Sequence, residues 1–302
     1  MTNREYKTDQ AFKTALEDRI RKVAKDVGWD MHRVRQLFLF DRFLVRVFAA
    51  FKERVILKGG VALELRLSQA RTTRDVDLRV SGDTSNLIGQ LRVAMKATAE
   101  DRLAFVVERN ADHPKIDNDG VEYEGERFVV HASLAGKIYG SQFGTDVSIG
   151  DQVVGMIEPC PPSIVVKPIL DFMGLTPAQG GLYPRESHVS EKFHAFTLPR
   201  ARENSRVRDL PDIALLASVG ALASSGLMSA LQATFATRKT HDLPGLFPDP
   251  PKRWEAQYTS LAAENDLPWK TLDAVTDAAR RFLEPVLEGK VGTWNPEKWE
   301  WT

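Results

Sequence analysis

Residues 57–80, LKGGVALELRLSQARTTRDVDLRV, decide the fold that this chain can adopt. The stretch begins at the end of an apolar run, residues 55–57, which favours a buried strand. The glycines Gly59 and Gly60 follow at once and lead into a segment with helical spacing. Glycine lets the backbone approach a phosphate closely, and the first N–H groups of a helix bind anions. The pair therefore predicts a phosphate-binding turn before a helix at 60–67.

Two carboxylates stand near the end of the same stretch. Asp75 and Asp77 alternate with apolar residues, which predicts a strand over 75–80. Side chains two apart on a strand face the same side, so these like charges need a cation between them. Mg²⁺ (or Mn²⁺), bridged to phosphate oxygens, is such a cation. Asp146, in the strand-like segment 143–149, is the expected third metal-binding carboxylate of a two-metal site.

The order of these features is the layout of polymerase-β-type nucleotidyltransferases: a strand, a glycine pair at a helix start, then Asp-x-Asp on the next strand. Each feature alone is common at turns and solvated strand ends, so the prediction rests on their combination. A nucleoside triphosphate (NTP) is the expected co-substrate. Gly59 and Gly60 are candidate nucleotide-binding residues, and Arg74, just after the helix, is a further one.

A second group of residues lies in segment 187–213, SHVSEKFHAFTLPRARENSRVRDLPDI. Its apolar residues recur at helical spacing, so Lys192 lies on a helix with one buried face. Asp209 opens the next helix after a polar loop. Acidic residues in a first turn also suit the helix dipole, so simple capping is the alternative explanation for Asp209.

Both blocks, LKGGVALEL…TTRDVDL and SEKFHAF…SRVRDLPDI, resemble the AbiEii/AbiGii-type nucleotidyltransferases. These proteins are the toxin half of bacterial toxin–antitoxin pairs and include the MenT-like toxins. The resemblance spans roughly residues 30–220. It implies an α+β fold: a polymerase-β-like nucleotidyltransferase core with a mixed sheet, N-terminal helices and a helical C-terminal half.

The resemblance also assigns roles to single residues. Asp75 and Asp77 would be catalytic metal-binding carboxylates, Lys192 would hold the triphosphate, and Asp209 would be a further essential acid. Some relatives carry a hydroxyl residue two positions before the first Asp that is phosphorylated to silence the toxin. Here that position is Thr73, and a phosphate there would repel the nucleotide. A buried or solvated threonine is the alternative.

The resemblance implies that the acceptor is the 3′ end of tRNA, that its modification blocks translation, and that a cognate antitoxin is the partner. The candidate RNA-binding residues share one short loop: Arg200, Arg202, Arg206 and Arg208. A solvated loop is the alternative. Other acceptors stay open, namely a protein or a small molecule such as an aminoglycoside, as does transfer of a bare phosphate. A third hypothesis is a non-enzymatic partner-binding protein with a vestigial site.

Composition favours an intracellular, cytoplasmic enzyme. The chain has 302 residues, 43% of them hydrophobic, and a formal net charge of +0. Its one cysteine, Cys160, excludes an internal disulfide framework. The polar N-terminus shows no secretory signal, and no apolar run is long enough to span a membrane.

The chain is expected to divide into a nucleotidyltransferase core with N-terminal helices (1–170) and a mainly helical domain that completes the active site (171–302). The second N-terminal helix should show its arginines outward, and the C-terminal tryptophans should dock on the protein. Expected helices lie at 12–27, 31–51, 60–67, 84–99 and through much of 187–286. Expected strands lie near 54–57, 75–80, 102–109, 121–134, 143–149, 152–158 and 163–167.

Overall fold

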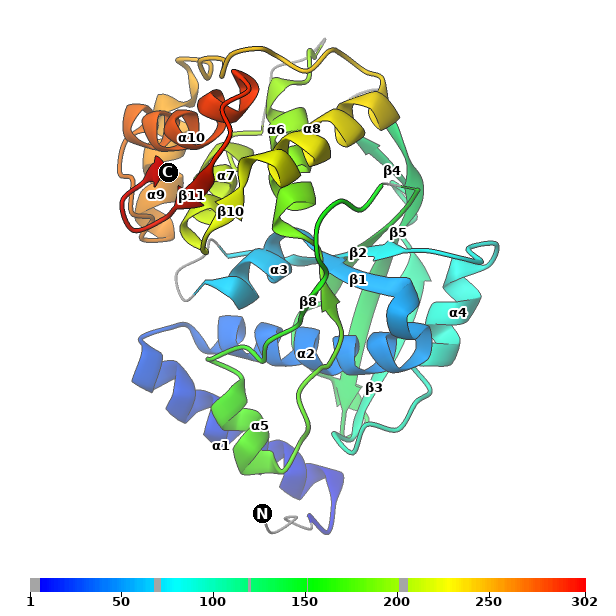
Figure 1. The fold of residues 1–302 in the computed structure, drawn as a ribbon. Helices are drawn as coiled ribbons and strands as arrows, with labels where there is room; N and C mark the ends of the chain where they lie inside the picture. Colours follow the sequence, from blue (N-terminus) through cyan, green and yellow to red (C-terminus); the bar gives the residue numbers. More distant parts are fainter. Residues whose placement is uncertain (1–5, 68–71, 119–120, 151, 201–205) are drawn as a thin grey trace.

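The computed structural model of the chain describes residues 6–67, 72–118, 121–150, 152–200 and 206–302. A β-sheet forms the middle of the molecule, with the N-terminal helices at one end and the helices that follow residue 184 at the other (Figure 1). The two termini lie at opposite ends. The architecture is the α+β type that the sequence predicts.

The helices are α1 (Asp9–Val27), α2 (Met31–Phe51), the 3₁₀ turn η1 (Lys52–Arg54), α3 (Gly59–Arg66), α4 (Leu87–Ala94), α5 (Lys167–Met173), α6 (Arg185–Thr197), α7 (Asp209–Ser218), α8 (Ser224–Arg238), α9 (Trp254–Glu264) and α10 (Leu272–Leu287). The strands are β1 (Val55–Lys58), β2 (Asp75–Val80), β3 (Leu103–Arg109), β4 (Lys115–Asn118), β5 (Val121–Leu134), β6 (Lys137–Ile138), β7 (Phe143–Ile149), β8 (Glu158–Pro159), β9 (Gly181–Leu182), β10 (Leu222–Ala223), β11 (Thr293–Asn295) and β12 (Glu300–Trp301).

Local signals set the ends of α1 and α2. The Thr8 side chain accepts a hydrogen bond from the Ala11 N–H, and Gly28 ends α1 in the left-handed conformation at φ 71°. Asp30 then caps α2 by accepting from the N–H groups of its first turn. The last residues of both helices and the start of α2 are as the sequence predicts, whereas α1 begins at Asp9 rather than at residue 12.

The expectation that the arginines of α2 point outward is wrong for Arg42 and Arg46, which are buried. The two terminal nitrogens of Arg46, Nη1 and Nη2, donate to Asp101 at 2.7 Å, and Arg42 pairs with Asp41. A buried charge is tolerated when a counterion and hydrogen bonds satisfy it. The counterion of Arg46 is 55 residues away in the chain, so helical spacing could not predict it.

The central sheet has the strand order β3-β5-β7-β2-β1-β9-β8, with β4 and β6 paired to β5. It is mixed, because β2 pairs parallel with β7 and antiparallel with β1. Strands β2, β5 and β7 have the predicted bounds. The parallel pairing of β2 with β7 brings together two segments that are almost seventy residues apart in sequence, and it positions the site described below.

Two predicted strands are wrong. Of 152–158, only Glu158 forms strand pairing, in β8, and 163–167 leads instead into α5. Pro168 explains the second failure, because it stands in the first turn of α5, a position where a helix accepts proline. The predicted helix 84–99 is shorter, since Asn86 caps α4 by accepting from the Gly89 N–H.

Buried apolar side chains form two clusters. One lies between residues 12 and 182, and the other joins Leu63 to residues between 189 and 294. The division into two domains at residue 170 stays a prediction. The tail docks as expected: Trp294 is fully buried, and the Trp301 indole N–H donates to the Phe282 carbonyl at 2.9 Å. In the described ranges, no helix is long and apolar enough to cross a membrane.

Candidate active site

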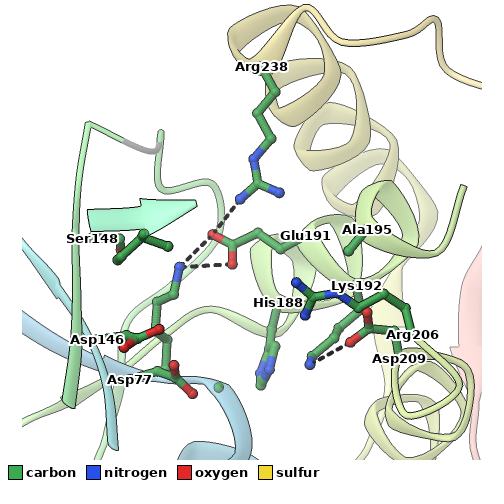
Figure 2. A pocket seen from close by; sticks show the side chains of 13 residues that line it. Asp77, Asp146, Ser148, His188, Glu191, Lys192, Ala195, Arg206, Asp209 and Arg238 are labelled. Atoms are coloured by element: carbon green, nitrogen blue, oxygen red, sulfur yellow. Dashed lines mark hydrogen bonds and ion pairs between the residues drawn. The ribbon is translucent and has the colours of Figure 1, made fainter. Parts of the chain in front are cut away.

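A pocket of about 150 Å³ lies where the sheet meets the C-terminal helices. Strands β1, β2 and β7 form one wall, and α6, α7 and α8 form the other, so both halves of the chain contribute (Figure 2). Its charged lining residues are Lys58, Asp77, Asp146, Glu191, Lys192, Arg206, Asp209 and Arg238.

A row of four charged residues crosses the sheet at this pocket. Asp77 of β2 lies between Lys58 of β1 and Asp146 of β7 in the strand registers. Asp146 is followed by Arg127 of β5, whose Nε donates to Asp146 Oδ2 at 3.1 Å. Cross-strand neighbours lie on one face of a sheet. The two carboxylates therefore stand side by side, flanked by two cations, and Asp146 lies beside Asp77 as predicted.

The start of α3 packs directly against Asp77. Gly59 has φ +65°, and a Cβ on it would lie 1.8 Å from Asp77 Oδ2. Only glycine allows this close approach. Lys58, the N-cap residue of α3, makes no side-chain capping hydrogen bond to the first turn of the helix. Asp75, two residues before Asp77, is exposed, lies outside the pocket lining and accepts from the Gly144 N–H at 3.2 Å.

Burial raises the proton affinity of both carboxylates, and the charge of Asp146 adds to the effect at Asp77. Burial, and then the charge of Asp146, raise the pKa of Asp77 to about 6 against the opposing charge of Lys58. Burial also raises the pKa of Asp146, while Arg127 acts to lower it. A cation placed between two such carboxylates would favour their charged forms.

The donor set fits a hard divalent cation, because Asp77 and Asp146 present adjacent carboxylates with elevated pKa values. Asp75 and Asp146 are engaged with Gly144 and Arg127, respectively. Over the part of the chain that the structure describes, no three His, Cys, Asp or Glu side chains are gathered closely enough to hold an ion. A third ligand to an ion at Asp77 and Asp146 would therefore come from Asp75 after a shift, or from substrate.

On the helical wall, Lys192 is held between two acids. Its Nζ lies 2.9 Å from Asp209 Oδ1 and 2.9 Å from Asp212 Oδ2. Lys192 comes from α6, and both acids come from the first turn of α7, where the helix dipole also favours them. Both acids are buried, Asp212 completely. The sequence predicted Lys192 and Asp209 as site residues but not that they pair with each other.

Glu191 was not predicted as a site residue, and it connects the two walls. Its carboxylate accepts from Lys58 Nζ at 2.9 Å and from the Tyr183 hydroxyl at 2.8 Å, and it lies 3.4 Å from Arg238 Nη2. Burial opposes ionisation, but Lys58 and Arg238 hold the pKa of Glu191 well below its usual range. The ion pairs join β1 to α6 and α8 (Figure 2).

Helical spacing contains a signal for the residues that were missed on α6. The positions that line the pocket are 188, 191, 192 and 195, which lie three or four apart on one face of the helix. Once Lys192 is taken as a site residue, this spacing selects His188, four positions before it, and the step of three from His188 then selects Glu191. Arg238, by contrast, comes from a different helix, and no local pattern near Lys192 indicates it.

The other predicted nucleotide-binding residues lie beside the pocket. Gly60 is buried, and a Cβ on it would lie 2.7 Å from the Thr73 side chain. Thr73 itself is 8% exposed and its hydroxyl donates to the Asp75 carbonyl at 3.4 Å. Arg74 is exposed and lies outside the lining of this pocket.

The predicted RNA-binding arginines are only partly brought together. Arg206 lines the pocket, and Arg208 is exposed just before α7. Arg200 is half-buried after α6, with Nη2 donating to the Ala195 carbonyl at 3.4 Å. Arg202 lies outside the described residues.

A family model described as the nucleotidyl transferase AbiEii toxin of type IV toxin–antitoxin systems matches residues 42–289. The chain belongs to the AbiEii family. The match covers more than half of the chain and contains every residue of both pocket walls. AbiEii proteins are nucleotidyltransferases, so the chain is an enzyme of this class in a toxin–antitoxin context. Nucleotidyltransferases generally take an NTP and a divalent metal.

Solved structures resemble the fold. MenT4, the nucleotidyltransferase toxin Rv2826c of Mycobacterium tuberculosis H37Rv, is 11% identical, with a TM-score of 0.52 over 93% of this chain and 92% of its own. JHP933 of Helicobacter pylori is 16% identical, with a TM-score of 0.43 over 86% of this chain and 94% of its own. At such identities the likeness to MenT4 concerns the fold alone. No curated protein is a significant match.

Proposed function

We propose that this AbiEii-family enzyme uses a divalent metal to transfer a nucleoside monophosphate from an NTP to the 3′ end of tRNA, which blocks translation in the cytoplasm. The observation that carries the proposal is the opposition of the Asp77–Asp146 pair to Lys192 across one pocket. Acids on one wall suit a metal ion, and a lysine on the other suits a phosphate chain.

Asp77 and Asp146 would hold the ion, Mg²⁺ or Mn²⁺, together with Asp75. When bound, the ion supplies positive charge that stabilises the phosphates and the attacking oxygen. The acceptor oxygen bonds to the α-phosphorus, the bond from that phosphorus to the β-bridging oxygen breaks, and pyrophosphate leaves. The hydroxyl proton passes to a carboxylate of the pocket. Asp209 acts by holding Lys192, as their 2.9 Å contact supports.

The size of the pocket supports binding of phosphates rather than of a whole nucleotide. It encloses about 150 Å³, whereas pockets that enclose a drug-sized ligand measure roughly 300–1,000 Å³. Phosphates would therefore enter between Lys192 and the glycines of α3, and the nucleoside would lie toward solvent. Gly59 fits such a role because it lines the pocket at an uncapped helix start.

Arginines at the pocket mouth favour RNA as the acceptor. Arg206 lines the pocket and Arg208 is exposed close by, which suits contacts to a phosphate backbone. A cationic drug such as an aminoglycoside would need a mainly acidic pocket, but the lining holds Lys58, Lys192, Arg206 and Arg238 beside its acids. As a member of a type IV toxin–antitoxin family, the enzyme would have a cognate antitoxin that opposes its effect.

The test is to incubate the purified protein with Mg²⁺, total tRNA and each α-³²P-labelled NTP in turn, followed by a denaturing gel. We expect label on tRNA from at least one NTP, and none with Asp77→Asn. Asp171→Asn is the matched control, because Asp171 is exposed on α5 and, among the described residues, pairs only with its neighbour Lys167.

Label on a protein or a small molecule instead of RNA would contradict the tRNA assignment and leave the family activity intact. Mass spectrometry of the product separates nucleotide transfer from transfer of a bare phosphate. Unchanged growth arrest by Asp77→Asn in cells would contradict an enzymatic basis for toxicity and favour partner binding.

A further inference from the structure

His188 is a buried polar residue whose ring has no hydrogen-bond partner in the described part of the chain. It lies on α6, is 1% exposed and lines the pocket. Neither Nδ1 nor Nε2 makes a hydrogen bond. In Figure 2 the ring stands between the Asp77 and Lys192 side chains. His188 precedes Lys192 by one helical turn, so both side chains lie on the same face of α6.

A buried histidine without hydrogen bonds destabilises the folded state, so packing alone does not account for it. Buried polar atoms are almost always paired, and an unpaired one loses its hydration without compensation. The neighbouring Ser187 shows the usual outcome on the same helix. It is also 1% exposed, and its hydroxyl both donates to the Val154 carbonyl and accepts from the Val154 N–H at 2.8 Å. His188 therefore differs from its neighbour in pairing and not in burial.

The ring of His188 is neutral at physiological pH. Burial, and then the charge of Lys192, lower the pKa of His188 to about 3. A neutral imidazole offers one N–H donor and one acceptor nitrogen. It can therefore bond to a phosphate or ribose oxygen without adding a second charge beside Lys192.

We propose that His188 is a nucleotide-binding residue whose ring nitrogens gain their hydrogen bonds from the NTP. The inference rests on the proposed function, because the triphosphate would draw Lys192 from Asp209 and Asp212 and thereby uncover the ring. The ligand supplies an oxygen acceptor to one nitrogen and a hydroxyl donor, such as a ribose hydroxyl, to the other.

The decisive comparison is His188→Phe against Ser187→Ala. Phenylalanine fills the same space without unpaired nitrogens, so the thermal midpoint of His188→Phe should equal or exceed that of the wild type. The KM for the NTP should rise by about tenfold or more, because His188→Phe removes both hydrogen bonds and one alone is equivalent to about tenfold, with a much smaller change in kcat. Ser187→Ala should show the opposite: a lower midpoint and an unchanged KM.

Two further variants keep the proposal testable if His188→Phe fails to fold. His188→Asn and His188→Gln place an amide near the positions of Nδ1 and Nε2, respectively, and an amide both donates and accepts. At least one should restore the KM to within about threefold of the wild type, which is about half of a tenfold step, or about 0.7 kcal/mol. An unchanged KM in His188→Phe, or recovery by neither amide, would overturn the role.

Direct binding separates this inference from the proposed function. Titration with Mg²⁺ and the α,β-methylene analogue of each NTP measures nucleotide affinity without transfer. Weaker binding by His188→Phe supports the inference even if the wild type labels no RNA, which would overturn the tRNA assignment alone. Equal binding by wild type and variant would overturn the role of His188 alone, and no binding by the wild type would overturn both.

Discussion

The two walls of the pocket hold their charges in different ways. On the sheet, Asp77 and Asp146 are neighbours, and their repulsion adds to burial in raising the pKa of Asp77. On the helical wall, Lys192 separates Asp209 from Asp212, with a 2.9 Å contact to each. The helical wall thus contains the cation that neutralises its acids, namely Lys192. The centre of the sheet wall, by contrast, holds two acids that repel each other. A bound metal ion should stabilise the sheet wall. A bound triphosphate should compete with Asp209 and Asp212 for Lys192 on the helical wall.

Asp77→Asn should have the largest effect on activity. Loss of the central acid should reduce nucleotide transfer by about 10³-fold, the scale seen when one stabilising group of a transition state is removed. The metal-free variant should unfold at the same or a higher temperature, since a buried and repelled charge has gone. An assay with labelled nucleotide measures the transfer, and thermal melting measures the unfolding temperature. Retained transfer would remove Asp77 from the proposed metal site.

Lys192→Met should reduce transfer by about 10²-fold and, unlike Asp77→Asn, should also destabilise the fold. It leaves Asp209 and Asp212 buried without their cation, and breaking a buried pair in this way costs about 3 kcal/mol. Urea unfolding measures the loss. Adding Asp212→Asn should recover part of the stability and none of the transfer. Unchanged stability would show that the ion pair does not hold α6 to α7.

Thr73→Glu should reduce transfer by about tenfold, because it adds a negative charge beside Gly60 and the metal-binding strand. We propose on this basis that phosphorylation of Thr73 silences the enzyme. Thr73→Val should keep near-normal transfer, since the hydroxyl makes only a 3.4 Å hydrogen bond to the Asp75 carbonyl. A kinase that phosphorylates the wild type and silences it should have no effect on Thr73→Val; inhibition of both would contradict the assignment.

The stability of the metal-free protein should depend on pH through Asp77. Its pKa is raised from 3.8 to about 6, so the folded state binds this proton more tightly than the unfolded chain. The stabilisation is present below pH 4 and is lost as pH rises through 6. The melting temperature of the wild type should therefore fall by a few degrees relative to Asp77→Asn between pH 4 and 7. Parallel pH profiles of the melting temperature for the wild type and Asp77→Asn would contradict the raised pKa of Asp77.

Arg208→Ala should give the smallest effect. Loss of one exposed cation should raise the KM for tRNA about threefold and reduce the salt dependence of binding by about one phosphate contact. Arg21→Ala is the matched control, because Arg21 is exposed on α1 and its one ion pair within the described ranges is with Asp18. Filter binding over a range of salt concentrations measures the slope. Equal slopes for both variants would exclude Arg208 from the RNA contact.

Much of the fold could be predicted, because its signals are local. The caps at Thr8, Gly28 and Asp30 set the ends of α1 and α2, and alternation of apolar residues sets β2 and β7. The predictions that failed concern segments whose structure depends on a proline or on a partner residue far away in the sequence. Segment 163–167 has strand-like composition but leads into α5, and Arg46 looks exposed by spacing but pairs with Asp101.

By itself, the sequence determined which chemical groups are present and which of them share a helix face or a strand face. Asp75 with Asp77, the glycines at the start of α3, and Lys192 on α6 follow from spacing, which depends only on backbone geometry. The tertiary structure alone decided the partners across the sheet and between helices. It put Asp146 beside Asp77, Asp212 on Lys192, and Glu191 between Lys58 and Arg238, because burial makes such charges depend on neighbours from distant segments.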